Sequence, residues 1–313
     1  MTGSPEPDDP WTGLGWDDGW CDAFARLPGT PARVGRVDSG WLRVLRREGA
    51  RSIAAPADGP APVTGDWVAC AFDDEPPGVL AVAPRRTALV RRDPADNAPR
   101  PQVLAANMDH VWIVHAVDQP LRAGWLDRAL VVAHGSGADV LVVVMKADLD
   151  GADDVIAGVA ALAPGVEVHA ASTVDGAGVA ALRTRLRDGR SAALLGRSGA
   201  GKSSLINALL GEATHRTGEV RAGDAKGRHT TTRRSLVRVG GGTVIDTPGV
   251  RALGLWDPTH GLALTFPEIA HLATRCRFTD CSHTHEPGCA VRSALDEGDL
   301  ASDRYQRYVT LSD

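Results

Sequence analysis

The sequence has no apolar run long enough to cross a bilayer, and it has only five cysteines among its 313 residues. Since a membrane-spanning helix needs about 20 apolar residues, we expect no contact with a membrane. Three of the five cysteines lie close together near the C-terminus, which is not the paired framework of a secreted domain. The acidic N-terminus also lacks the charged and then apolar leader of a secretory signal, so we expect a cytoplasmic protein.

An excess of positive charge is also missing, since the formal net charge is −5. That average does not favour a nucleic-acid-binding protein. It hides a basic stretch from Thr214 to Arg251, which carries eight Lys or Arg against three Asp or Glu. Such a stretch beside a nucleotide site either meets an RNA backbone or forms a solvated loop whose arginines hold the nucleotide. Charge alone favours neither interpretation.

Four segments differ in sequence texture. Residues 1–30 are rich in Pro, Gly, Asp and Trp, and we expect an acidic flexible tail that packs in part through its tryptophans. Residues 31–92 hold short alternating runs between Gly- and Pro-containing turns, which predicts a small barrel of the OB type. Residues 93–253 alternate apolar strands with helical spacing, which predicts a parallel α/β sheet. Residues 254–313 are helical and irregular, with a cysteine cluster inside.

The predicted barrel carries three arginine pairs, Arg46-Arg47, Arg85-Arg86 and Arg91-Arg92. A barrel with basic rims often binds nucleic acid, and the alternative is a structural spacer.

A phosphate-binding loop is the clearest chemical signal in the chain. Residues 196–203 fit the pattern G-x-x-x-x-G-K-[ST], with the apolar run Ser191–Leu195 before them and the helical run Ser204–Leu210 after them. Glycines let backbone N–H groups turn toward phosphate oxygens, and the helix N-terminus adds the positive end of its dipole. We therefore expect phosphate contacts from Gly196, Arg197, Ser198, Gly199, Ala200, Gly201, Lys202, Ser203 and Ser204.

A candidate base-reading motif, Met145-Lys146-Ala147-Asp148, ends the apolar run Val140–Val144. A carboxylate at that place can accept from both N1–H and the 2-amino group of guanine, which adenine cannot match. Ser172, a short way downstream, would lie beside the base oxygen. This motif precedes the phosphate loop here, although it usually follows it.

Two further segments are expected to contact the Mg²⁺ ion and the γ-phosphate. Asp246-Thr247-Pro248-Gly249 follows the apolar strand Thr243–Ile245, so that Asp246 can hold Mg²⁺ through water and the N–H of Gly249 can reach a γ-phosphate. Residues 227–232, with the sequence Gly-Arg-His-Thr-Thr-Thr, lie between the phosphate loop and Asp246. A threonine hydroxyl there, from Thr231 or a neighbour, can complete the Mg²⁺ shell when a γ-phosphate is present.

A metal site is predicted near the C-terminus. Three thiols and one imidazole lie within fourteen residues, at spacings that suit tetrahedral Zn²⁺. With four protein ligands the site is closed to water, so we expect structural rather than catalytic zinc. The ligands would be Cys276, Cys281, His283 and Cys289.

In this order the motifs closely resemble those of the circularly permuted GTPases of the ribosome small-subunit-dependent GTPase A family. The resemblance covers roughly residues 31–300 and includes Gly65-Asp66-Trp67-Val68, Ala105–Asp109, Phe266-Pro267-Glu268 and Glu286–Cys289. It implies an α/β fold with an N-terminal OB-type barrel, a circularly permuted P-loop GTPase domain and a C-terminal, mostly helical zinc domain. It also implies slow GTP hydrolysis stimulated by the small ribosomal subunit, a role in the late maturation of that subunit, and binding to its rRNA. We expect a monomer.

Residue by residue, the resemblance implies that Lys202 binds β- and γ-phosphate oxygens and that Ser203 binds Mg²⁺. Asp246 would support the same ion, and Thr231 or a neighbour would sense the γ-phosphate. Asp148 would read guanine. The zinc ligands would be the four residues of the C-terminal cluster.

Two positions bear on the affinity for the nucleotide and on the rate of its hydrolysis. Met145 stands where GTPases generally have Asn, and its thioether cannot replace hydrogen bonds to the base and the phosphate loop, each worth about 1 kcal/mol. Val250 stands where many GTPases orient water with Gln, so hydrolysis should be slow until another group is positioned. His229 is the candidate for that group, and we expect it to act in catalysis together with Lys202 and Thr231. Its alternative role is to contact rRNA or to stabilise the loop.

Three interpretations stay open from the sequence. The first is a ribosome-activated GTPase that acts as an assembly switch, and the second is a GTP-dependent rRNA-binding module with vestigial hydrolysis. The third is a diverged paralogue or P-loop ATPase with relaxed nucleotide specificity. Single-turnover hydrolysis with small subunits separates the first two, and Asp148→Asn tests the third.

Overall fold

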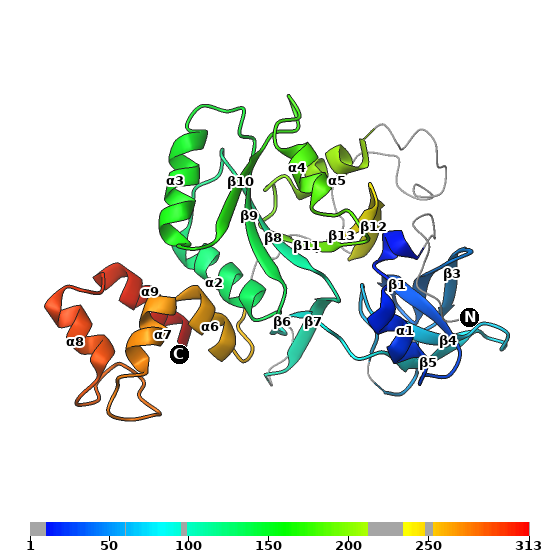
Figure 1. Ribbon diagram of the computed structural model, residues 1–313, viewed down its shortest axis with the longest axis horizontal. Coiled ribbons are helices and arrows are strands. Elements are labelled where there is room, and N and C mark those ends of the chain that lie inside the picture. Colours follow the sequence, from blue (N-terminus) through cyan, green and yellow to red (C-terminus); the bar gives the residue numbers. More distant parts are fainter. Residues whose placement is uncertain (1–10, 60, 95–98, 212–233, 248–252, 313) are drawn as a thin grey trace.

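A small β-barrel, a central α/β sheet and a group of C-terminal helices follow one another along the chain (Figure 1). The structure, a computed structural model, describes residues 11–59, 61–94, 99–211, 234–247 and 253–312. Within these ranges no helix has both the length and the apolar character that crossing a membrane requires.

The barrel consists of β1 (Thr30–Asp38), β2 (Trp41–Arg46), β3 (Gly49–Ala54), β4 (Trp67–Ala71) and β5 (Gly78–Val82). Strand β1 pairs with both β2 and β4, and β3 pairs with β5, so the hydrogen bonds run round a closed order β1-β2-β3-β5-β4. Alternate residues point inward, and Val34, Val44 and Ile53 are among those that form the barrel core. The predicted N-terminal barrel is therefore confirmed.

The described part of residues 1–30 packs against the barrel through its tryptophans. Two short helices lie there, η1 (Thr12–Leu14) and α1 (Asp18–Phe24). The rings of Trp11, Trp16 and Trp20 have centroids 5.2, 4.9 and 5.9 Å from that of Trp67 in β4. Burial of several aromatic rings outweighs the entropy lost on ordering this acidic segment.

A hairpin connects the barrel with the central sheet. Its strands, β6 (Ala88–Arg92) and β7 (Pro101–Ala106), form a two-stranded antiparallel sheet of their own. The predicted barrel extended to residue 92, whereas β6 pairs with β7 instead.

The central sheet consists of β8 (His110–Ala116), β9 (Asp139–Met145), β10 (Glu167–Ala171), β11 (Ser191–Gly196), β12 (Ser235–Val239) and β13 (Gly242–Asp246). Their order is β10-β9-β8-β11-β13-β12, and the pairs are parallel except β12–β13. The chain goes from β10 at one edge back to β11 beside β8. The strand order therefore reverses between β8 and β11, and open α/β sheets bind ligands at the carboxyl ends of strands at such a point.

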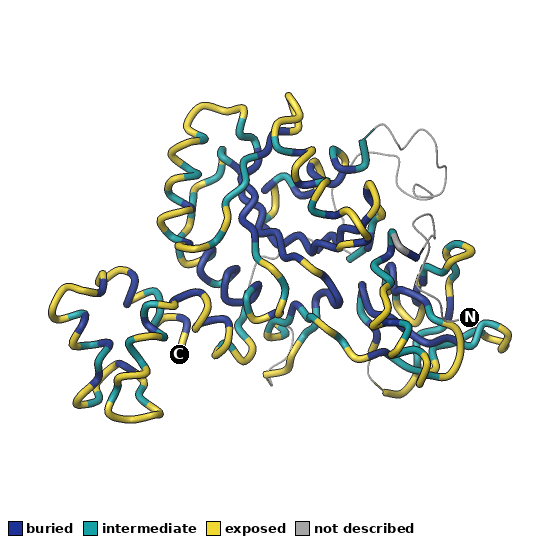
Figure 2. The backbone as a smooth tube through the Cα atoms, viewed as in Figure 1, coloured by how far each residue is buried: buried dark blue, intermediate teal, exposed yellow. Residues whose placement is uncertain are grey.

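Helices cover both faces of this sheet: α2 (Ala123–His134), α3 (Ala152–Leu162), α4 (Val179–Thr184) and α5 (Lys202–Leu210). Leu130 of α2 and Val159 of α3 share one core with Ile113 of β8. On the other face, Leu205 of α5 packs in a core with Trp112, the neighbour of Ile113 in β8. The strands lie buried between these layers (Figure 2).

The sheet continues into the barrel. Strand β12 pairs with β13 on one side and, through Ser235 and Arg36, with β1 on the other, which gives a sheet of eleven strands.

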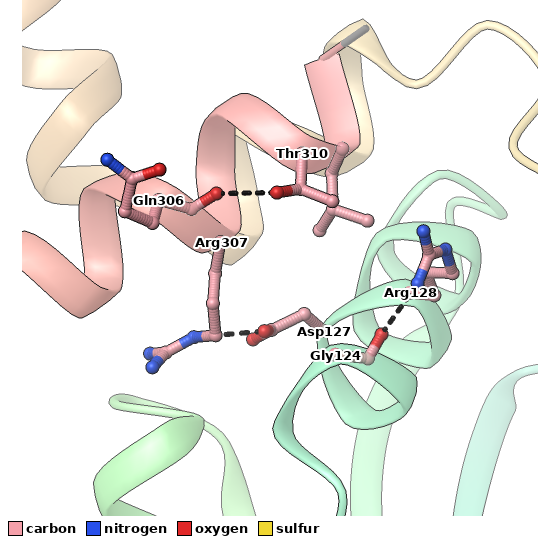
Figure 3. A pocket seen from close by; sticks show the side chains of 7 residues that line it. Gly124, Asp127, Arg128, Gln306, Arg307 and Thr310 are labelled. Atoms are coloured by element: carbon pink, nitrogen blue, oxygen red, sulfur yellow. Dashed lines mark hydrogen bonds and ion pairs between the residues drawn. The ribbon is translucent and has the colours of Figure 1, made fainter.

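The C-terminal helices are α6 (Thr259–Thr265), α7 (Pro267–Ala273), α8 (Ala290–Glu297) and α9 (Ser302–Ser312). Phe266, Ile269 and Val291 form their core, which also contains Val131 of α2. Helix α9 lies beside α2, where Arg307 Nε is 3.0 Å from Asp127 Oδ2 (Figure 3).

Candidate active site and metal centre

The phosphate loop lies at the carboxyl end of β11, where the sheet topology predicts a ligand. Strand β11 ends at Gly196, and α5 begins at Lys202. Gly199 and Gly201 between them have φ of +79° and +95°, a region that L-residues with a side chain seldom adopt. The loop thus has the strand–turn–helix form that turns N–H groups toward phosphate oxygens.

Lys202 lies folded over this loop. Its Nζ donates to the carbonyl oxygens of Gly196 at 2.9 Å and Arg197 at 3.1 Å, and the side chain is buried. Burial lowers the pKa of Lys202, while the nearby carboxylate of Asp246 opposes that shift. Phosphate oxygens can replace the two carbonyl groups as partners of the ammonium group.

Asp246 ends β13, next to β11, and its register partner there is Leu194. Burial raises the pKa of Asp246 and the charge of Lys202 opposes the shift. Among the described residues the buried Oδ1 of Asp246 has no hydrogen-bond partner. An unpaired carboxylate oxygen beside a phosphate loop fits a hydrated Mg²⁺ ion. Ser203, in the first turn of α5, is exposed and open to the same ligand.

The base-reading motif lies at the ends of β9 and β10, on the same edge of the sheet. Asp148 Oδ1 accepts a hydrogen bond from Ser172 Oγ at 2.5 Å, so these two predicted residues lie together. Ala147 N donates to Ala171 O at 3.2 Å, which ties the motif to β10. Lys146 has φ of +61° and forms an ion pair with Asp118.

Met145 is buried against the phosphate loop. A Cβ atom on Gly201 would lie 3.2 Å from Met145 Cβ and Cγ, so the thioether side chain packs on the loop through apolar contact. The thioether group of Met145 has no hydrogen to donate, so it makes no hydrogen bond to a carbonyl group of the loop.

Two residues of the site have no counterpart in the predicted motifs. Asp118 contacts Lys146, and Gln119 Nε2 donates to Ser198 O at 3.0 Å. Their position directly after the buried strand β8 was a usable signal, because polar residues at the carboxyl end of a central strand reach the ligand edge.

The four predicted zinc ligands lie together between α7 and α8. Sγ of Cys276 and Sγ of Cys289 are 3.9 Å apart, and each lies 3.5 Å from His283 Nδ1. The ligand atoms of these three residues and Cys281 lie within 4.8 Å of one another. A tetrahedral ion with Zn–S of about 2.3 Å and Zn–N of about 2.0 Å needs S···S and S···N separations of about 3.8 and 3.5 Å.

The surroundings also suit a metal. Burial lowers the pKa of His283, which keeps the imidazole neutral as a metal ligand must be. Tyr305 Oη donates to His283 O at 2.8 Å, so α9 supports the ligand loop. The four side chains can hold one metal ion, and their sulfur-rich set favours zinc.

Several predicted residues lie outside the described ranges. They are His229, Thr231 and Gly249, together with the rest of residues 227–232. Their roles stay predictions.

These features define a class of protein, a P-loop GTPase in which the base-reading strand precedes the phosphate loop, with a β-barrel before it and a helical lobe that contains a Cys₃His cluster after it. Comparison with known proteins gives the family. The sequence pattern of the RsgA GTPase family matches residues 82–256, more than half of the chain, which therefore belongs to this family of GTPases.

Similar proteins match along nearly the whole chain. A Streptomyces coelicolor protein named small ribosomal subunit biogenesis GTPase RsgA is 44% identical over 307 residues, which cover 94% of this chain and 83% of that protein. A protein of the same name from Opitutus terrae is 42% identical over 331 residues, which cover 95% and 88%.

Solved structures share the fold. The crystal structure of YjeQ from Thermotoga maritima is 27% identical with a TM-score of 0.64, and the match covers 90% of this chain and 96% of that one. YloQ, described as a circularly permuted GTPase, is 24% identical with a TM-score of 0.61, and the match covers 92% and 94%. The predicted circular permutation is thereby confirmed.

Proposed function

We propose that this GTPase acts in the biogenesis of the small ribosomal subunit, with GTP bound across the carboxyl ends of β9, β11 and β13. One observation carries the assignment of the site. The phosphate loop, the buried Asp246 and the Asp148–Ser172 pair follow strands of one sheet and meet at the same edge, although their order in the sequence is rotated. The relatives named small ribosomal subunit biogenesis GTPase RsgA support the biological role.

In this proposal the phosphate loop binds and orients the triphosphate. Backbone N–H groups from Gly199 to Ser204 face the β-phosphate, and Lys202 exchanges its two carbonyl partners for β- and γ-oxygens. Because the Lys202 side chain is buried, its charge acts in a medium of low dielectric constant, where it stabilises developing negative charge more than an exposed charge would.

Ser203, Asp246 and Thr231 would hold Mg²⁺ beside these oxygens, with Asp246 acting through water. The ion, when bound, neutralises charge on the β- and γ-phosphate oxygens. Gly249 would donate its N–H to the γ-phosphate. His229 is proposed to orient the attacking water, since Val250 has no polar group with which to do so.

Asp148 is proposed to read guanine. Ser172 already holds its carboxylate through a hydrogen bond at 2.5 Å, which fixes the acceptor oxygens before the base arrives. The base would lie between Lys146 and the end of β10. Met145 would support the phosphate loop by packing against Gly201.

The C-terminal cluster is proposed to hold one structural zinc ion. Cys276, Cys281, His283 and Cys289 supply all four ligands, so no position is open for a substrate water. The ion would order the loop between α7 and α8.

The ribosomal partner is proposed to include rRNA, with the protein acting as a cytoplasmic monomer. The barrel presents cationic and aromatic groups together, since the guanidinium carbons of Arg46 and Arg51 lie 4.5 and 5.5 Å from the centre of the Phe72 ring. Trp41 is 52% exposed at the start of β2, the strand that ends at Arg46. Stacking surfaces next to arginines are what single-stranded RNA contacts.

Single-turnover GTP hydrolysis, with and without purified small ribosomal subunits, tests the proposal. We expect slow hydrolysis by the protein alone and at least tenfold stimulation by the subunits. Lys202→Ala should abolish both, and His229→Ala should remove the stimulation while GTP binding persists. Equal rates with and without subunits would contradict the ribosomal role, and unchanged stimulation in His229→Ala would exclude that residue from the chemistry.

A further inference from the structure

The turn after β8 touches both halves of the proposed nucleotide site. Asp118 Oδ2 lies 2.5 Å from Lys146 Nζ in the base-reading motif, and Gln119 Nε2 donates to Ser198 O in the phosphate loop. The turn itself is closed by Gln119 N, which donates to Ala116 O at 3.0 Å. Two adjacent side chains therefore connect the two motifs.

Gln119 lies close to Gly199 in the middle of the loop. A Cβ atom on Gly199 would come within 2.9 Å of Gln119 Nε2, so a side chain at this position would require the carboxamide to move. The positive φ of Gly199 and the bond to Ser198 O together hold this peptide in one orientation.

Met145 lies against the other end of the same loop, at Gly201. GTPases generally have Asn at this position of the motif, with an amide that bonds to the phosphate loop. Here the contact is apolar, and the loop obtains a side-chain amide from Gln119 instead.

We propose that Gln119 is a positioning residue for the phosphate loop and supplies the amide hydrogen bond that Met145 cannot make. The inference rests on the proposed binding of GTP at this loop. By fixing the Ser198 carbonyl, Gln119 keeps the following N–H groups turned toward the phosphates before the nucleotide arrives. A loop that is already ordered binds its ligand without a further loss of entropy.

The test is a double-mutant cycle read by the affinity for fluorescent mant-GDP and mant-GTP. Four proteins are compared: the natural chain, Gln119→Leu, Met145→Asn and the double variant. We expect Gln119→Leu to weaken binding about five- to tenfold in the natural background, which is the worth of one net hydrogen bond. In the Met145→Asn background the same change should weaken binding less than about twofold, because the new amide holds the loop.

Gln119→Glu is the matched control, since it keeps the size of the side chain but offers only acceptors at neutral pH. It should bind nucleotide no better than Gln119→Leu. In steady-state hydrolysis the loss should fall on KM more than on kcat, as expected for a residue that orders the binding loop. Equal losses in both backgrounds, or natural affinity in Gln119→Glu, would overturn the proposal.

Lys202→Ala separates this inference from the proposed function. If Lys202→Ala binds mant-GTP as tightly as the natural chain, the loop is not the nucleotide site and both proposals fail. If Lys202→Ala loses binding while Gln119→Leu keeps it, only the role of Gln119 is refuted.

Discussion

Arg304 is one of the arginines through which α9 contacts the central α/β part, and Arg304→Met tests that contact. Its Nε donates to Glu268 Oε1 at 2.6 Å, and its Nη1 lies 3.9 Å from Asp127 Oδ1 on α2. Arg307 contacts the other oxygen of the same carboxylate (Figure 3). Asp127 is completely buried, so its charge depends on these two arginines.

The expected loss of stability in Arg304→Met follows from the contacts of Arg304 that a methionine side chain can and cannot make. Methionine keeps an apolar stem but loses the guanidinium group, whose carbon lies 4.1 Å from the centre of the Phe266 ring. It loses the hydrogen bonds to the carbonyl oxygens of Leu162 and Thr265 and the ion pair with Asp127. Removing one partner of a buried ion pair costs about 3–5 kcal/mol. Since Arg307 still faces Asp127, we expect the lower value, about 3 kcal/mol, for the separation of α9 from α2.

Hydrogen exchange of the α9 amides measures this separation directly. A loss of about 3 kcal/mol should speed exchange through local opening by about 100-fold, while the amides of α5 serve as an internal reference. Arg128→Met is the matched control, because Arg128 lies on α2, lines a cavity of about 260 Å³ together with Asp127 and Arg307, and donates to Gly124 O within its own helix. An acceleration below fivefold in Arg304→Met, or one equal to that in Arg128→Met, would refute the reasoning.

Three further predictions concern specificity, metal and pH. Asp148→Asn should lower GTP affinity about 100-fold and favour xanthosine triphosphate, because each hydrogen bond to the carboxylate is worth about 1.5–3 kcal/mol; competition against mant-GDP measures both, and an unchanged preference contradicts guanine recognition. Cys281→Ala should reduce zinc, measured by elemental analysis, from one ion per chain to under a tenth, whereas Cys21→Ala should keep it. Burial raises the pKa of Asp127 from 3.8 to about 6, so the folded state binds this proton more tightly than the unfolded state. The resulting stabilisation is complete below about pH 4 and is lost as pH rises through about 6, so the unfolding free energy of the natural chain relative to Asp127→Asn should fall by about 3 kcal/mol across this window. Denaturant titrations at pH 4 and pH 7 measure it, and a pH-independent difference would contradict the assignment.

The central strands and the phosphate loop could be predicted because their signals are local. The apolar runs Val111–Val117 and Val140–Val144 become β8 and β9 with small shifts at their ends, since parallel strands covered on both faces are continuously apolar. The run Leu121–His134 becomes α2, which begins at Ala123. The Cys₃His cluster could be predicted for the same reason, because all four of its residues lie in one short segment.

Pairing between distant segments could not be predicted in this way. The sequence indicated a parallel sheet, but β12 is antiparallel and also joins β1, a partner about 200 residues away in the chain. Trp16 and Trp20 stand among aspartates, so composition favoured a tail, and only the position of Trp67 shows what they pack against. Gln119 belongs to no motif, and its contact depends on the relative position of two strands that are far apart in sequence.

Because of the strand register and the permuted order, Asp246 is linked directly to both the barrel and the C-terminal helices. Asp246 pairs with Ser235 of β12, and Ser235 pairs with Arg36 of the barrel strand β1. Neighbouring strands are about 4.8 Å apart, so the backbone of Asp246, the residue proposed to support Mg²⁺, lies two strand spacings, or about 10 Å, from the backbone of Arg36 in the barrel. Along the chain, the same residue leads within fifteen positions to α6 of the C-terminal lobe. Because the permutation makes β13 the last strand of the sheet in sequence, a ligand that displaces Asp246 would act on both flanking parts at once. In an order where β13 led on into β8, the C-terminal lobe would lose that direct connection.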